Sequence, residues 1–278
     1  MRFGKFARMM GAIAAMAVMG AVAGCNADIK FNGEEGVPLA DLDTGGEAPT
    51  EFALMGPDRV TLTEGDSLII EPSGNADEIE KLRFVLKDGA LGIHRDNESR
   101  NNTAVDIAIT MPAPTKIAIM GSGSVTSGKL AREAEVAIMG SGSADTRNVD
   151  SDRLDVKIAG SGDYAASGSV RALKLKIAGS GSGDMGELRA ETAEVDIAGS
   201  GSATFASDGS VDAKVVGSGD VTVRGSAKCT IKSVGSGTLN CEPGSGPAAP
   251  RGAAAPETPE PPQGPGAADA PEAPEAGE

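Results

Sequence analysis

Short segments in which apolar and polar residues alternate recur along the chain, and each ends at a Gly-Ser-Gly tripeptide. The residues two and four positions before the first glycine are mostly aliphatic, and the residue between them is mostly polar, as in Val156-Lys157-Ile158. This two-residue period predicts strands with one buried face, and the β-branched side chains favour the same conclusion. The tripeptide occurs seven times, beginning at Gly121, Gly140, Gly160, Gly179, Gly199, Gly217 and Gly235.

The spacing of these glycines, in steps of 18 to 20 residues, indicates a repeat architecture. A circuit of this length corresponds to one coil of a small parallel β-helix, and glycine permits the sharp turn at its corner. We therefore predict an all-β fold, a single-stranded parallel β-helix with regular repeats over residues 121–242. Connections between parallel strands favour a right-handed coil. A left-handed hexapeptide helix is the alternative, although its 18-residue circuit does not fit steps of 19 and 20.

Residues 51–120 show a less regular version of the pattern. Segments such as Val60-Thr61-Leu62 and 82–86 are typical of strands, and Gly65-Asp66 and Asp88-Gly89 are turn signals. Solenoids need atypical terminal repeats to cover their open ends. We expect this part to form irregular N-terminal β coils that cap the solenoid.

The first residues are typical of an export signal. Three basic residues within positions 2–8 precede an uncharged stretch over 9–24, which is shorter than the roughly 20 residues of a membrane span. The sequence Val22-Ala23-Gly24-Cys25 resembles the lipobox of bacterial lipoprotein precursors. That resemblance implies a signal peptide over 1–24, lipid on Cys25 and, because Asn26 follows, an outer-membrane location. An ordinary cleaved signal is the alternative, and the side of the membrane that the protein faces stays open.

The composition of the flanking segments and of the whole chain indicates their order and the partners that the protein can bind. Residues 25–50 are polar and Gly-rich, which predicts a flexible tether. Residues 243–278 hold ten prolines and six acidic residues, which predicts a disordered acidic tail. The formal charge of −15, without a cluster of Lys or Arg, argues against nucleic-acid binding. With Cys25 assigned to lipid, Cys229 and Cys241 form an even pair in an exported protein, so we expect either a disulfide or two separate buried thiols.

No set of residues predicts catalysis, a metal site or a cofactor. Gly65-Asp66-Ser67-Leu68 matches the opening motif of one esterase class, but His94 is the only histidine available to activate a serine. Acidic residues near the turns lack the spacing of calcium-binding β-rolls. A divergent carbohydrate-active enzyme would need carboxylates that converge on one flank of the solenoid.

The region from Phe52 to Leu239 resembles the bacterial head-GIN domain, a family of autotransporter-adhesin head domains. The resemblance rests on the opening strand, on Val60-Thr61-Leu62 followed by Gly65-Asp66, and on the repeated Ile-x-Gly-Ser-Gly coils. It implies a parallel β-helix in the cell envelope and supplies no catalytic residues. We expect a non-catalytic surface module that binds a glycan or protein, with homo-oligomers as a further possibility. A periplasmic envelope scaffold or a stress-related structural lipoprotein is the alternative function.

Overall fold

The structure is a computed structural model that describes residues 34–96 and 103–242. These residues belong to the first of two compact units, Met1–Gly244. The predicted signal peptide, the lipid-bearing Cys25 and the predicted acidic tail lie outside the described residues.

The described residues are almost entirely β-structure. In chain order the elements are η1 (Leu39–Asp41), β1 (Glu51–Met55), β2 (Arg59–Glu64), β3 (Ile69–Ser73), α1 (Ala76–Ile79), β4 (Leu82–Lys87), β5 (Ala90–Arg95), β6 (Asp106–Met111), β7 (Lys116–Gly121), β8 (Ser124–Ser127), β9 (Glu133–Gly140), β10 (Ser143–Gly160), β11 (Asp163–Gly179), β12 (Ser182–Gly199), β13 (Ser202–Gly217), β14 (Asp220–Arg224), β15 (Lys228–Gly235) and β16 (Thr238–Glu242).

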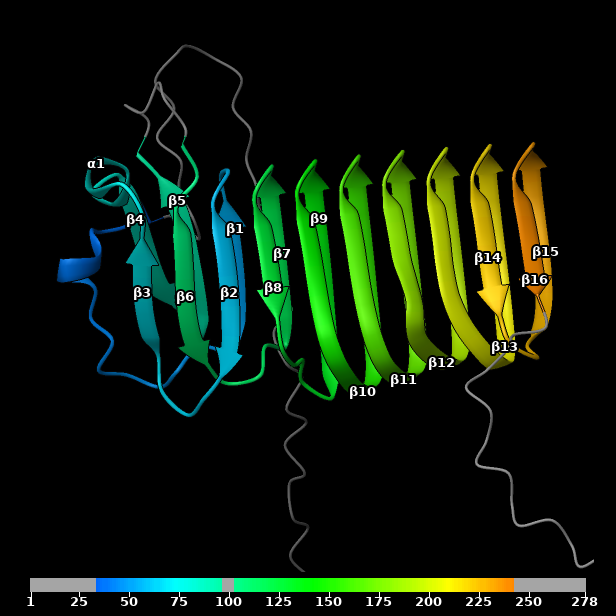
Figure 1. The fold of residues 1–278 in the computed structure, drawn as a ribbon, viewed down its shortest axis with the longest axis horizontal. Helices are drawn as coiled ribbons and strands as arrows, with labels where there is room; N and C mark the ends of the chain where they lie inside the picture. Colours follow the sequence, from blue (N-terminus) through cyan, green and yellow to red (C-terminus); the bar gives the residue numbers. More distant parts are fainter. Residues whose placement is uncertain (1–33, 97–102, 243–278) are drawn as a thin grey trace, which may run out of the picture. The chain divides into compact units, whose positions relative to one another are not determined.

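The strands form two parallel stacks that follow one axis, as Figure 1 shows. The first stack has the order β5, β1, β7, β9, β10, β11, β12, β13, β15. The second has the order β6, β2, β8, β10, β11, β12, β13, β14, β16. The long strands β10–β13 bend around the solenoid and therefore contribute to both stacks. The predicted parallel β-helix is confirmed.

The N-terminal coils do not follow chain order. The coil made by β1 and β2 lies between the coil of β5 and β6 and the coil of β7 and β8. Beyond β5 and β6, strands β4 and β3 pair with them in the antiparallel direction and cover that end. The turn between β4 and β5 is Asp88-Gly89, in which both residues have positive φ, as a tight hairpin requires.

The glycine corners are fixed by contact with the coil below. The first glycine of each tripeptide has φ between +119° and +126°. A Cβ on Gly160 would lie 2.4 Å from the carbonyl oxygen of Gly140, and a Cβ on Gly162 would lie 2.7 Å from that of Gly142. Between them, the Ser161 N–H donates to Gly140 O at 2.9 Å. Both glycines are therefore required by close approach of backbones, and the tripeptide repeats because the coils do.

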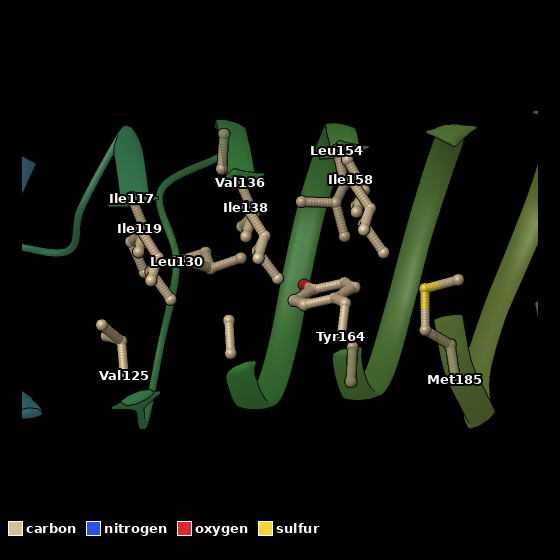
Figure 2. Packing of buried hydrophobic residues seen from close by; sticks show 14 of the residues in the cluster. Ile117, Ile119, Val125, Leu130, Val136, Ile138, Leu154, Ile158, Tyr164 and Met185 are labelled. Atoms are coloured by element: carbon tan, nitrogen blue, oxygen red, sulfur yellow. The ribbon is translucent and has the colours of Figure 1, made fainter. Parts of the chain in front are cut away.

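The core consists of columns of aliphatic side chains between the two stacks. The residue two positions before each first glycine is at most 2% exposed in the first six coils of the repeat: Ile119, Ile138, Ile158, Ile177, Ile197 and Val215. Figure 2 shows how these columns meet Tyr164, whose ring lies inside the solenoid near Leu154 and Ile158. The Tyr164 hydroxyl is 2.6 Å from Thr146 Oγ1, so its polar end is satisfied.

The titration of Tyr164 gives a test of this core. Burial raises the pKa of Tyr164 well above its usual range, although the hydrogen bond with Thr146 opposes that rise. In the unfolded chain the tyrosine hydroxyl loses its proton near pH 10. The contribution of the neutral Tyr164 hydroxyl to the free energy of unfolding is therefore complete below about pH 10, and it falls as the pH rises further. Since Tyr164 is the only tyrosine of the sequence and Trp is absent, the ultraviolet absorbance of tyrosinate reports the ionisation of Tyr164 alone. We expect tyrosinate to appear together with loss of the β-sheet circular dichroism signal. Ionisation near pH 10 in a folded protein would contradict the buried position.

Candidate binding face

From β8 to β16, the outer surface of the second stack presents a regular array rich in hydroxyls and carboxylates, called here the hydroxyl face. Each coil contributes two outward residues to this face, the third and the fifth after the first glycine of its tripeptide. All members are exposed or half-buried, and none is Lys or Glu. The face consists of Ser124, Thr126, Ser143, Asp145, Asp163, Ala165, Ser182, Asp184, Ser202, Thr204, Asp220, Thr222, Thr238 and Asn240.

The outer surface of the first stack is different in charge and bonding, and is called here the ion-pair face. Its side chains pair with one another across coils: Lys157 Nζ lies 2.6 Å from Glu135, and Lys174 Nζ lies 2.8 Å from Glu194. Lys214 adds contacts of 3.6 Å to Glu194 and 3.7 Å to Asp196. Each such exposed pair contributes little to stability. Together they neutralise part of the charge of this face.

Some hydrogen bonds join neighbouring coils within the described part of the hydroxyl face. Ser182 donates from Oγ to Asp163 Oδ1, and Thr238 donates from Oγ1 to Asp220 Oδ1. A hydroxyl is one donor and two acceptor sites, and a carboxylate accepts several bonds. Coils are about 4.8 Å apart, so the face repeats this capacity at a short and constant interval. It is suited to a long polar ligand that contacts several coils.

A groove of about 630 Å³ extends this face toward the corner where the coils bend. Arg224 of β14 reaches back across β13 to Gly186 of β12, where its Nη1 atom lies 3.0 Å from the position that a Cβ would take. Gly186 therefore makes room for the guanidinium. The charged and polar residues that line the groove are Asp145, Arg147, Ser167, Asp184, Glu187 and Arg224.

The groove leaves some of its charges available. Arg147 forms an ion pair with Asp145 at 3.0 Å. Among the residues that the structure describes, Arg224, Asp184 and Glu187 take part in no ion pair or side-chain hydrogen bond. Charges of both signs can therefore meet a ligand here, next to the hydroxyl face.

The residues predicted from the sequence lie in two kinds of position. The seven glycines form the corner ridge between the two stacks. Cys229 of β15 and Cys241 of β16 form a disulfide, with their Cα atoms 6.7 Å apart. They continue the inward columns of Val211 and Val223, so the disulfide lies at the end of the core. The hydroxyl face was not predicted, although its signal was the polar residue three and five positions after each first glycine.

Removal of this disulfide is expected to loosen the last coil. A closed loop of this length contributes about 3 kcal/mol, so Cys229→Ser with Cys241→Ser should lower the free energy of unfolding by about that amount. Urea unfolding measures the loss, and hydrogen exchange should locate it in β15 and β16. The unaltered chain, denatured without reductant, should show no maleimide labelling at these cysteines. Labelling of both would contradict the disulfide.

His94 and the acidic residues near the turns lie in different parts of the described chain. His94 is buried in β5, where Nδ1 lies 3.2 Å from the Arg95 carbonyl oxygen and Nε2 has no hydrogen-bond partner. Its ring therefore bonds no hydroxyl among the described residues. Within that same part of the chain, no three His, Cys, Asp or Glu side chains are grouped to hold a metal ion. No helix there is long and apolar enough to cross a membrane.

Fold and surface together define a parallel β-solenoid with one face rich in ion pairs and one face rich in hydroxyls. The family model described as "Putative auto-transporter adhesin, head GIN domain" matches residues 48–227, and the chain belongs to this family. No curated protein matches the chain.

Solved structures share the fold. A putative adhesin from Bacteroides fragilis has a TM-score of 0.66 at 23% identity, covering 70% of this chain and 93% of its own. A putative lipid binding protein from Parabacteroides distasonis has a TM-score of 0.57 at 20% identity, with the same coverages. A putative adhesin from Parabacteroides merdae has a TM-score of 0.52 at 14% identity, covering 70% of this chain and 92% of its own. These similarities support the β-solenoid architecture of the chain.

Proposed function

We propose that this protein is a non-catalytic lipoprotein of the outer membrane that binds glycans at the cell surface through its hydroxyl face. The observation that carries the proposal is the contrast between the two faces. The ion-pair face carries Lys, Glu and Asp side chains that pair across coils, whereas the hydroxyl face repeats donors and acceptors without Lys or Glu. Adhesin names among the proteins of similar fold support a binding role.

The negative charge of the hydroxyl face determines which classes of glycan it can bind. The two outward columns between Ser124 and Asn240 contain four carboxylates, Asp145, Asp163, Asp184 and Asp220, and no cation. Sulfated or sialylated chains would meet like charge, which disfavours binding. Neutral or amine-bearing polysaccharides fit better. Each coil offers only a few polar contacts, so useful affinity comes from many coils that engage one long chain.

Export and anchoring are supported by the N-terminal sequence. The basic residues, the apolar stretch and the lipobox-like Val22-Ala23-Gly24-Cys25 fit a lipoprotein precursor. More than one acyl chain on Cys25 gives a stable anchor, since each buried methylene contributes about 0.8 kcal/mol. Mass spectrometry of the membrane-extracted protein should find Cys25 acylated at a new N-terminus. An unmodified Cys25 would contradict the anchor and leave the binding face unaffected.

Binding to immobilised polysaccharides tests the function. The full chain with Cys25→Ser would be applied to surfaces of mannan, chitosan and heparin, as neutral, amine-bearing and anionic probes. We expect binding to mannan or chitosan and none to heparin. Ser182→Lys with Ser202→Lys should weaken that binding at least about tenfold, because two long cations replace hydroxyls in adjacent coils.

The matched control is Ser169→Lys, an exposed serine outside both faces, in β11. It introduces one lysine in place of an exposed serine away from the face, and it should leave binding unchanged. Circular dichroism must show that all variants keep the β-solenoid. Equal loss in the control, or stronger binding to heparin than to the other surfaces, would contradict the hydroxyl face as the binding site.

A further inference from the structure

The last coil is open on its outer side. Among the described residues, β15 pairs only with β13, and β16 pairs only with β14. Val234 is 70% exposed and Ile231 is 39% exposed, and seven of the eight residues of β15 are exposed. Figure 1 shows these two strands at the end of the row, opposite the end that β3 and β4 cover. An open edge of this kind presents unpaired N–H and C=O groups to another strand.

We propose that a second copy of this chain occupies this edge, so that two solenoids join end to end across a two-fold axis. The axis pairs β15 with β15 of the second copy and β16 with β16, each in the antiparallel direction. Such an interface is isologous and closes as a dimer. The disulfide between Cys229 and Cys241 links the two edge strands. The disulfide therefore holds β15 and β16 at a fixed separation, which is the same in both copies, so both strand pairs can form together.

The segment that follows β16 is a poor strand partner for this edge. Residues 243–278 contain a proline in every stretch of six residues. Proline has no N–H to donate and is excluded from the interior of a sheet. The edge strand β15 is eight residues long, and no part of this segment can match that length without proline. A second copy supplies two proline-free strands of the required lengths.

The lysines of β15 select one register. With Ile231 on the two-fold axis, Lys232 lies opposite Thr230, and Val234 lies opposite Lys228 of the second copy. Ile231 then meets its own counterpart and covers its exposed surface. A shift of the axis to Thr230 would place Lys228 opposite Lys232, and like charges directly opposite are destabilising. The charge pattern therefore favours Ile231 at the centre.

Sedimentation equilibrium of the full chain with Cys25→Ser tests the proposal. We expect a dimer at about 100 µM, a concentration that reveals even weak association. Val234→Lys should weaken the dimer at least about tenfold, because it opposes Lys228 of the second copy. Val234→Glu should leave it as tight or tighter, because it pairs with that lysine. Circular dichroism must confirm that the variants fold.

Val216→Lys is the matched control. Val216 is 57% exposed and precedes Val234 in the same column, one coil inside the edge. This variant should dimerise as the unaltered chain does. A monomeric unaltered chain would overturn the proposal, as would equal weakening by Val234→Lys and Val234→Glu or by Val216→Lys. A chain ending at Glu242 that dimerises while the full chain stays monomeric would also overturn it, because residues 243–278 would then occupy the edge. The edge lies outside the groove and uses backbone groups, so this result is independent of glycan binding.

Discussion

Gly179→Ala is expected to lower the free energy of unfolding by about 2–5 kcal/mol, the sum of backbone strain and overpacking. Gly179 has φ +125°, a conformation that residues with a Cβ rarely adopt. Its added Cβ would lie 2.3 Å from the carbonyl oxygen of Gly160 in the adjacent coil. That oxygen accepts a hydrogen bond from Ser180 N–H at 2.9 Å, so it cannot move away without breaking the ladder.

Urea unfolding monitored by circular dichroism measures this effect. The matched control is Ser180→Ala, which changes the next residue, is exposed and keeps the backbone N–H. It should change the free energy of unfolding by less than about 0.5 kcal/mol. If Gly179→Ala were as stable as Ser180→Ala, the close approach of coils at the glycine ridge would be wrong.

Asp58→Ala is expected to cost about 3–5 kcal/mol, because it leaves a buried cation without its main partner. Asp58 is fully buried and accepts hydrogen bonds from Arg95 Nε at 3.0 Å and from the Val105 N–H at 2.9 Å. Arg95 Nη2 donates a second hydrogen bond to Asp58 Oδ1, and Arg95 also pairs with Glu78 of α1. The cluster joins the corner after β1 to β5 and to the cap.

The neighbouring Arg59 provides the control for Asp58→Ala. Arg59 pairs with Asp106 at 2.6 Å, but their side chains are 56% and 59% exposed. Arg59→Ala should therefore cost no more than about 1 kcal/mol. Chemical denaturation compares the two variants, and similar losses would contradict the buried cluster.

The same cluster makes the stability of the N-terminal region around α1 depend on pH. A hydrogen bond from Lys81, followed by one from Arg95, lowers the pKa of the Glu78 carboxyl, and burial opposes this in part. A carboxyl with a lowered pKa stabilises the fold above its unfolded pKa and loses that contribution as the pH falls through the folded pKa. We expect hydrogen exchange near α1 to increase in acid before it increases in β10–β13.

The regular coils could be predicted from the sequence because their cause is local. The Gly-Ser-Gly tripeptide marks the same corner in each regular coil, and in five of the seven a buried isoleucine stands two residues before it, so the spacing of the tripeptide gives the period directly. The hydroxyl face follows the same rule, and the residues three and five positions after each first glycine could have revealed it. Cys229 and Cys241 were paired from their even number, and the structure places them on adjoining inward columns.

The N-terminal coils could not be ordered from the sequence. Pairing of Glu51 with Lys116 joins residues far apart in the chain, and nothing in either strand specifies the other as its neighbour. The antiparallel direction of β3 depends equally on its partner β6. The one local sign of a change was Gly56-Pro57-Asp58, which replaces the tripeptide where Asp58 meets Arg95.

The surface position of the hydroxyl face is the central claim, and cysteine labelling on intact cells tests it most directly. Ser202→Cys places a thiol on that face, and Ala203→Cys places one in the core, where Ala203 is only 2% exposed. Cells of a double-membraned bacterium that express each variant would be treated with a membrane-impermeant maleimide, and a periplasmic protein with an exposed cysteine would report leakage. We predict labelling of the Ser202→Cys variant on intact cells and no labelling of the Ala203→Cys variant. Labelling of Ser202→Cys only after the outer membrane is opened would contradict surface binding and favour a periplasmic scaffold.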